Sequence, residues 1–178
     1  VGDISLTSLL ERTRAEALPF YRHAAELLAQ LDRAGESVVE INPPFDQAKF
    51  REELDQTRRY YVEELAGVDS RALEGMFALL ADRLTKHPYM LCHRDYHGQN
   101  IFIQNNKLYL IDYQDLRMGP DMYDLASLLR DRGVGPLLGQ EFETSRIEER
   151  AAAVGSSVDE VRVRYLEALL QRSIKAIG

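Results

Sequence analysis

The residues with the clearest chemical potential lie between Met90 and Asp115, where acidic and amide side chains follow short apolar runs. The first polar segment has the pattern HRDxxxxN, which places Asp95 five residues before Asn100. Transfer of a phosphoryl group needs an oriented hydroxyl nucleophile and divalent metal ions that neutralise charge on the phosphate oxygens. Asp95 can accept the hydroxyl proton, whereas Asn100 and Asp112 offer oxygen ligands of the kind that hard cations prefer. The pattern therefore predicts phosphoryl transfer to a hydroxyl group.

Short apolar runs on both sides of this segment are expected to position the three side chains. The runs Tyr89–Cys92 and Ile101–Ile103 have the length and the β-propensity of buried strands. A third run, Leu108–Ile111, is expected to pair with the second across a turn at residues 105–107. Such a hairpin would return Asp112 to the loop that precedes the second strand.

Three motifs, HRDYHGQN, IDYQD and GPDMYDLA, occur in this order. They resemble motifs of the aminoglycoside phosphotransferase and choline kinase family, a branch of the protein-kinase-like fold. The family's first motif has the form HxDxHxxN, which His93, Asp95, His97 and Asn100 match. Protein kinases usually carry Lys at the position of His97, so the second histidine favours the small-molecule branch. Arg94 departs from the Gly that is common there in antibiotic kinases.

A narrower likeness concerns the substrate. The run HRDYHxxN with IDxQD and YDLxSLLRD is most similar to bacterial kinases that phosphorylate the anomeric hydroxyl of N-acetylmuramate and N-acetylglucosamine. The acidic composition alone suits a cationic aminoglycoside or choline instead, so amino sugars, aminoglycosides and choline-like molecules all remain candidates. The resemblance implies a kinase of a small-molecule hydroxyl, with ATP as the phosphoryl donor and Mg2+ as its metal.

The resemblance also implies site residues. Asp95 would be the catalytic base, and Asn100 and Asp112 would bind Mg2+ and, through it, the nucleotide. His97 lies near the transferred phosphate in this family, although bracing of the loop is an equally good interpretation. Asp124 is expected to be a buried acid that holds the catalytic loop from the next helix.

Other polar residues near the motif have mainly structural interpretations. His93 is expected to brace the loop, and Asp115 either contacts metal or substrate or belongs to a turn. A zinc site made by His93, His97 and Asp95 is the competing chemistry, because imidazoles and carboxylates are ordinary zinc ligands. A zinc site would leave Asn100 and Asp112 without a role, so we favour Mg2+.

The composition is that of a globular domain, with 45% hydrophobic and 29% charged residues in a chain of 178. A net charge of −7 argues against a nucleic-acid-binding protein, which would have a basic face. The single cysteine, Cys92, excludes an internal disulfide framework and is expected to be an inert core thiol. No signal peptide or 18-residue apolar run is present, so we expect a cytoplasmic protein without membrane association.

Apolar periodicity and cap residues predict helices along the rest of the chain. A connecting loop is expected at Val38–Phe45, because Pro43 and Pro44 prevent a helix there. The third helix is expected to bury Phe50, Leu54, Tyr61 and Leu65, and the last helix Val161, Tyr165, Leu169, Leu170 and Ile174. The predicted helices begin at or near Leu6, Ala17, Asp46, Ser70, Asp121, Gln140 and Ser157.

Several local signals are assigned to structure. Gly119-Pro120 predicts a turn, and Asp121 the cap of the helix after it. His87 is expected to be only a cation at a helix end. The cluster at residues 58–61, RRYY, is expected to be a solvated basic edge with two packed rings, and GVGPLLG at residues 133–139 a connector rather than a phosphate-binding loop.

These elements predict a mainly α fold with a small β-hairpin (α+β), a protein-kinase-like C-terminal lobe over residues 1–178. In the resembled family, Val1-Gly2-Asp3 corresponds to the hinge between two lobes, so the N-terminal nucleotide-binding lobe, a partner of this one, is expected to be absent. No Gly-rich loop or strand Lys that would cover the nucleotide phosphates is found. Alone, the chain is expected to bind ATP poorly and to be inactive. The alternatives are a non-catalytic pseudokinase-like binding or regulatory domain and a helical interaction module.

Overall fold

The computed structural model describes residues 4–34 and 42–177, which form mostly helices (65%) and two small antiparallel sheets. The predicted fold class, mainly α with a small β component, is therefore confirmed. The helices are α1 (Leu6–Arg12), α2 (Arg14–Ala34), α3 (Gln47–Thr57), the π-helix η2 (Arg58–Leu65), α4 (Arg71–Leu84), α5 (Tyr123–Arg130), the 3-10 helix η3 (Asp131–Gly133), α6 (Gly135–Leu138), α7 (Gln140–Val154) and α8 (Val158–Lys175). The strands are β1 (Ile4–Ser5), β2 (Tyr89–Cys92), β3 (Ile101–Gln104), β4 (Lys107–Leu110) and β5 (Arg117–Pro120).

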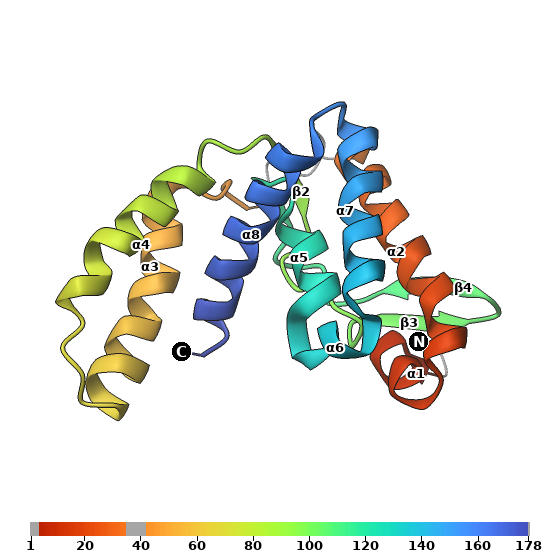
Figure 1. Cartoon of the computed structure of the whole chain (residues 1–178), viewed down its shortest axis with the longest axis horizontal. Helices are drawn as coiled ribbons and strands as arrows, with labels where there is room; N and C mark the ends of the chain where they lie inside the picture. The colour runs from red at the N-terminus through yellow and green to blue at the C-terminus, as the bar shows by residue number, and fades with distance from the viewer. Residues whose placement is uncertain (1–3, 35–41, 178) are drawn as a thin grey trace.

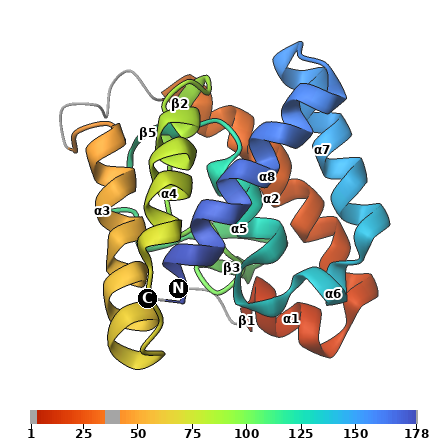
Figure 2. The same cartoon turned by 60° about the vertical axis from the view of Figure 1, so that its left-hand side comes forward.

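Helix α8 lies in the middle of the helical body. It contacts α3, α4, α5 and α7, and Figures 1 and 2 show the α3–α4 pair on one side of it and α7 on the other. Its first turn has the predicted capping box, since Ser157 Oγ accepts from the Glu160 N–H at 3.3 Å and Glu160 Oε2 accepts from the Ser157 N–H at 3.2 Å.

The predicted buried face of α8 is only partly correct. Leu170 is 45% exposed, and the fully buried positions continue the line of Val161 and Tyr165 through Ala168 to Gln171 and Arg172. Two of these residues are polar because the neighbouring elements offer charged partners there. Leu169 and Ile174 are partly buried against the core as predicted, so the prediction was wrong for Leu170 and missed the two buried polar residues.

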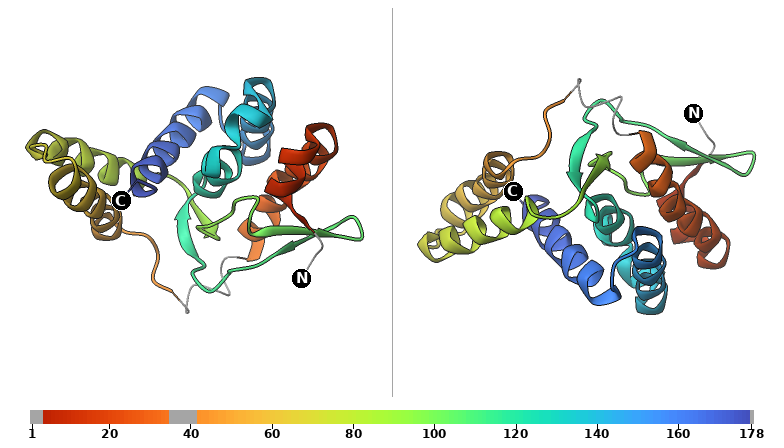
Figure 3. Two further views of the ribbon diagram at one scale, coloured as in Figure 1. Left: turned by 90° about the horizontal axis from the view of Figure 1, so that it is seen from below. Right: turned by 90° about the horizontal axis from the view of Figure 1, so that it is seen from above.

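The predicted β-hairpin is confirmed as β3 and β4, with Ile101 opposite Leu110 and Gln104 opposite Lys107. Its two turn residues, Asn105 and Asn106, both have positive φ (51° and 59°), the conformation that a tight turn between right-twisted strands needs. The short strand β1 adds to the other edge of β3, so this sheet has the order β1-β3-β4 (Figure 3).

The second sheet was not predicted. Strand β2 pairs antiparallel with β5, which contains the Gly119-Pro120 step that the sequence assigned to a turn. Gly119 is required there by packing, since a Cβ at this position would lie 2.7 Å from Cδ2 of Phe45. A glycine beside a proline therefore marks a close backbone approach in this strand.

Most cap predictions agree with the structure. The Ser5 side chain accepts from the Ser8 N–H at 3.2 Å, and the Asp46 carboxylate accepts from the Lys49 N–H at 2.7 Å. Helix α2, however, begins at Arg14 rather than Ala17, so Pro19 lies beyond its first turn. A proline there removes a single backbone donor, and the helix continues past it.

Two residues assigned to helix ends have tertiary contacts instead. Asp121 does not cap α5; its carboxylate pairs with Arg164 of α8 at 3.1 Å. His87 is only 8% exposed, and its Nε2 lies 2.7 Å from the carboxylate of Glu167, which is also on α8. Both contacts join segments far apart in sequence, which local patterns could not indicate.

The third predicted helix changes geometry part-way. Phe50 and Leu54 are fully buried in α3, as predicted, but the chain continues as the π-helix η2, where Tyr61 is 44% and Leu65 75% exposed. The wider turns of a π-helix rotate later residues away from the stripe that a 3.6-residue period predicts. The prediction of one continuous buried face was therefore wrong from Arg58 onward.

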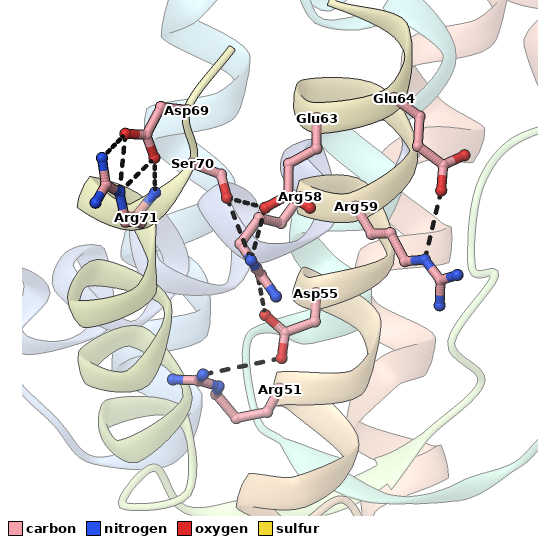
Figure 4. A network of polar contacts seen from close by, with 9 residues as sticks. All are labelled: Arg51, Asp55, Arg58, Arg59, Glu63, Glu64, Asp69, Ser70 and Arg71. Carbon is pink, nitrogen blue, oxygen red and sulfur yellow. Dashed lines mark hydrogen bonds and ion pairs between the residues drawn. The ribbon is translucent and has the colours of Figure 1, made fainter. Parts of the chain in front are cut away.

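The RRYY cluster lies in η2 (Figure 4). Arg58 Nη1 donates to Glu63 at 2.8 Å, and Arg58 Nε donates to Asp55 at 3.1 Å. Arg59 pairs with Glu64, so the predicted basic edge is present. The prediction of packed rings was wrong, since Tyr60 is 50% exposed.

Two predictions concern residues outside the described part of the chain: the hinge at Val1–Asp3, and residues 38–41 of the loop ending at Phe45. The described end of that loop contacts the strand region beyond it, because the Asn42 amide donates to the carbonyl groups of Gln114 and Leu116 at 2.9 and 3.0 Å. No helix in the described residues is long and apolar enough to cross a membrane.

We predict opposite effects for two glycine-to-alanine substitutions. Gly119→Ala should lower the free energy of unfolding by about 1–3 kcal/mol, because the new Cβ meets the Phe45 ring. Gly75→Ala, in the exposed interior of α4 where a Cβ meets nothing within 4 Å, should raise it by about 0.5–1 kcal/mol. Urea unfolding measures both; a Gly119→Ala protein as stable as the parent would contradict the packing at β5.

Candidate active site

A buried carboxylate holds the start of the loop between β2 and β3. Asp124, on α5, accepts from the His93 N–H at 2.5 Å and from the Arg94 N–H at 3.0 Å, one bond to each carboxylate oxygen. It is 1% exposed, and this burial raises its pKa although the two N–H groups and nearby Arg172 act in the opposite direction. The structural role predicted for Asp124 is confirmed by these bonds.

A chain of hydrogen bonds joins this loop to the ends of the β-hairpin. The His93 ring donates from Nε2 to the Ile111 carbonyl at 2.9 Å, and the Ile111 N–H donates to the Asn100 carbonyl at 3.1 Å. The Asn100 side-chain amide donates to the Asp95 carbonyl at 3.0 Å. Asp112, the residue after Ile111, therefore follows directly on the backbone segment bound to Asn100, as the hairpin prediction required.

The far side of the loop packs against α1 and α2 without room for a side chain. A Cβ on Gly98 would lie 2.6 Å from both Thr7 Oγ1 and Tyr21 Oη, and the Thr7 N–H donates to the Gly98 carbonyl at 3.1 Å. The glycine therefore lets the β2–β3 loop pack directly against α1 and α2.

Two non-glycine residues of the site have a left-handed backbone: Arg94 (φ 77°) and Asp112 (φ 67°). Such conformations persist only where surrounding contacts impose them. Arg94 is held at its carbonyl by Arg172 Nη1 at 2.5 Å and at its guanidinium by Glu53 at 2.9 Å and Asp115 at 3.2 Å. Glycine would adopt this backbone without strain. Asp115 lies in a turn, and its carboxylate is an ion-pair partner of Arg94.

Asp95 and His97 line a pocket of about 310 Å3. Asn100 and Asp112 are not among its lining residues; Asp112 is exposed, and its Oδ1 accepts from the Gln114 amide at 2.6 Å. The other walls of the pocket come from the ends of α5 and α8, with Arg130, Asp131, Arg172, Ser173, Lys175 and Ala176. Asp95 and His97 thus line the same pocket. Asn100 and Asp112 lie outside its lining, on chain segments joined by the bond between the Ile111 N–H and the Asn100 carbonyl.

A wider cavity, of about 610 Å3, lies between the C-terminal end of α4 and the N-terminal half of α8, beside His87 and Glu167. None of the motif residues lines it. We therefore place the candidate active site at the smaller pocket, where the residues with a chemical rationale are.

The pocket residues of α8 were missed by the sequence analysis. Arg172 and Lys175 line the pocket and continue the spacing of the buried stripe of that helix, but they are charged. Gln171 and Glu53 do not line it; both are buried and share a hydrogen bond of 2.8 Å. Charged residues at core-facing positions were the available signal. Because a single sequence does not indicate which helices meet, it could not assign these residues to the site.

The metal predictions can be examined through the donor atoms. Within residues 4–34 and 42–177, no group of three or more His, Cys, Asp or Glu side chains is placed to hold a metal ion, which argues against zinc at His93, His97 and Asp95. Asn100 donates from its amide nitrogen, which leaves its amide oxygen for a cation, and Asp112 has a second carboxylate oxygen. An amide and a carboxylate oxygen fit Mg2+, which usually takes few protein ligands.

A comparison with protein-family models identifies the chain. The model of the phosphotransferase enzyme family matches residues 4–166. The chain belongs to this family. The resemblance predicted from the three motifs is therefore confirmed, and the match covers the loop, the hairpin and the first half of α8.

Among the curated relatives are N-acetylmuramate/N-acetylglucosamine kinases, as the narrower likeness predicted. The enzyme of Pseudomonas aeruginosa is 27% identical over 154 residues, which cover 79% of this chain and 45% of the relative. That of Neisseria meningitidis is 28% identical over 163 residues, which cover 85% of this chain and 48% of the relative. The chain thus spans about half the length of the curated relatives it matches.

Solved structures support the fold. An aminoglycoside phosphotransferase from Streptomyces rimosus, in complex with ADP and streptomycin, has a TM-score of 0.61 at 19% identity over 87% of this chain and 61% of that chain. Plasmodium vivax ethanolamine kinase has a TM-score of 0.65 at 15% identity over 98% of this chain and 54% of that one. This family member therefore has the protein-kinase-like architecture that the motifs implied.

We predict that Asp124→Ala lowers the free energy of unfolding by about 2–5 kcal/mol at pH 7, because two buried N–H donors each lose their acceptor. Asp82→Ala is the control, since Asp82 is a partly exposed residue of α4 that pairs with Lys86 just beyond the helix, and its loss should change stability by less than about 0.5 kcal/mol. Chemical unfolding of both variants makes the comparison; similar small losses would show that Asp124 is not what holds the loop.

Proposed function

We propose that the protein containing this chain transfers a phosphoryl group from ATP to a hydroxyl group of a small molecule. The observation that carries the proposal is the position of Asp95 and His97 together on one wall of a pocket large enough for part of a small acceptor. Membership of the phosphotransferase enzyme family supports it.

Asp95 is the proposed catalytic base. Its backbone carbonyl is fixed by the Asn100 amide at 3.0 Å, and its side chain is only partly buried, so it can reach both the pocket and the acceptor hydroxyl. The carboxylate accepts the proton that leaves the hydroxyl as the new bond to phosphorus forms. His97, on the same wall, is proposed to contact the transferred phosphate.

Asn100 and Asp112 are the proposed Mg2+ ligands. The hydrogen bond between the Ile111 N–H and the Asn100 carbonyl supports this pairing, because it ties the two ligand-bearing segments together. Bound Mg2+ would neutralise negative charge on the phosphate oxygens of ATP. The left-handed backbone of Asp112 gives its carboxylate a fixed direction before any ligand binds.

The chain is proposed to be the C-terminal, acceptor-binding lobe of a two-lobed enzyme. Its span of about half the curated relatives supports this proposal, as does the lack of a Gly-rich loop with a strand Lys in its sequence. We propose that a separate N-terminal lobe covers the nucleotide phosphates. This chain by itself should then bind ATP weakly and transfer no phosphate.

An amino sugar is the proposed acceptor. The curated relatives that support it are N-acetylmuramate/N-acetylglucosamine kinases, whereas the solved structures include an aminoglycoside phosphotransferase and an ethanolamine kinase. The sugar kinases match this chain at 27–28% identity, and the two solved structures at 15–19%.

We predict that Asp95→Asn, in the full-length protein, lowers kcat by at least about a hundredfold while ATP affinity changes little, because the amide cannot accept the hydroxyl proton. ADP release with N-acetylglucosamine measures turnover, and titration calorimetry measures ATP binding. Asp159→Asn, an exposed substitution in the first turn of α8, is the matched control. Unchanged turnover in Asp95→Asn would refute the proposed base and favour a binding or regulatory domain.

A second prediction concerns the metal. Asp112→Asn should raise the Mg2+ concentration for half-maximal activity by about tenfold or more, because a neutral amide replaces a charged ligand. Asp69→Asn, on the surface before α4, should leave the Mg2+ dependence unchanged. An Asp112→Asn enzyme with the parent's Mg2+ dependence would remove Asp112 from the metal site.

A further inference from the structure

The pocket beside Asp95 carries three cationic side chains, and two of them have close acidic partners. Arg130 donates to both carboxylate oxygens of Glu143, at 2.8 and 2.5 Å. Arg172 donates to both oxygens of Asp131 and also to a backbone carbonyl of the catalytic loop. Their charges are therefore compensated within the protein.

Lys175, in the last turn of α8, is compensated less well. Its Nζ lies 3.6 Å from Glu53 Oε1, which is too far for a direct hydrogen bond. The two oxygens of Glu53 are already used, one by Arg94 at 2.9 Å and the other by Gln171 at 2.8 Å. Lys175 thus shares the Glu53 carboxylate with Arg94, whose distance to it is shorter, 2.9 Å against 3.6 Å.

The surroundings of Lys175 leave its ammonium group open to an incoming anion. Burial is the main cause that lowers the pKa of Lys175; among the nearby charges Glu53 raises it most, Arg94 and Arg172 lower it, and Asp95 raises it. The side chain is still 32% exposed, so a ligand can reach its ammonium group. A carboxylate in the pocket would supply the missing hydrogen-bond acceptor and the missing negative charge.

We propose that Lys175 determines acceptor specificity by binding a carboxylate of the substrate, so that the acceptor of this enzyme is an acidic amino sugar. The inference rests on the proposed function and names its substrate class. Polycationic acceptors are disfavoured, because their ammonium groups would face Lys175 in a partly dehydrated pocket. The overall charge of −7 does not contradict this, because the three cations that line the pocket outnumber its two carboxylates, Asp95 and Asp131.

The test compares two sugars that differ by one carboxylate. N-acetylmuramate is N-acetylglucosamine with a lactyl ether on O3, so the ratio of their kcat/KM values measures recognition of that group. In the full-length protein, Lys175→Met should lower the ratio about tenfold, mainly through KM for N-acetylmuramate, as expected for a lost charge-assisted hydrogen bond. Lys175→Arg should recover much of it, and Lys175→Glu should lower it further.

Lys49→Met is the matched control, because the Lys49 side chain is also 32% exposed and pairs with an acid, Glu52, but lies on α3 away from the pocket lining. It should leave the ratio unchanged. Thermal unfolding of every variant separates a loss of fold from a loss of recognition. An equal fall in kcat/KM for both sugars in Lys175→Met would overturn the inference, since Lys175 would then act on the phosphate or on the fold.

Titration of each sugar in the absence of nucleotide separates this inference from the proposed function. If no phosphate is transferred but wild-type protein binds N-acetylmuramate more tightly than N-acetylglucosamine and Lys175→Met removes the difference, the carboxylate site stands and the kinase proposal fails. If phosphate is transferred and the ratio is unaffected by Lys175→Met, only the carboxylate site fails. Tighter binding of ethanolamine than of either sugar would also overturn it.

Discussion

The Asp124 carboxylate, buried on the first turn of α5, accepts one backbone N–H at each of its oxygens. Because those N–H groups belong to His93 and Arg94, the start of the β2–β3 loop is fixed relative to the helix. Leaving either donor unpaired in the interior would cost about 1–3 kcal/mol, which is similar to the strain of one left-handed residue, so these bonds can offset the strain at Arg94. The direction of Asp95 follows from this attachment.

The second constraint is long-range. Arg172, near the end of α8, joins the Arg94 carbonyl to Asp131 at the end of α5, so the last helix of the chain closes the pocket that the loop opens. Its guanidinium also lies over the Tyr123 ring at 4.6 Å. A buried arginine with several acceptors is stable only if all of them are present together. Loop, α5 and α8 therefore form one unit.

Local and distant interactions explain what could be predicted from the sequence. The β3–β4 hairpin, the capping box at Ser157 and the structural role of Asp124 depend on neighbours in the chain or on a motif with fixed spacing, and all were predicted. The β2–β5 pair and the polar face of α8 depend on which elements meet, and were missed. The π-helix at Arg58 was missed because periodicity analysis assumes 3.6 residues per turn.

The charge of the pocket can be traced to one position in the loop. Where glycine would accept a left-handed backbone without a side chain, this chain has Arg94, whose guanidinium is almost buried and needs an anion. Glu53 supplies it from α3 at 2.9 Å, together with Asp115 at 3.2 Å. Lys175 lies 3.6 Å from the Glu53 carboxylate and shares it with Arg94. The arginine at residue 94 therefore affects the charges beside the pocket through the carboxylate that it shares with Lys175.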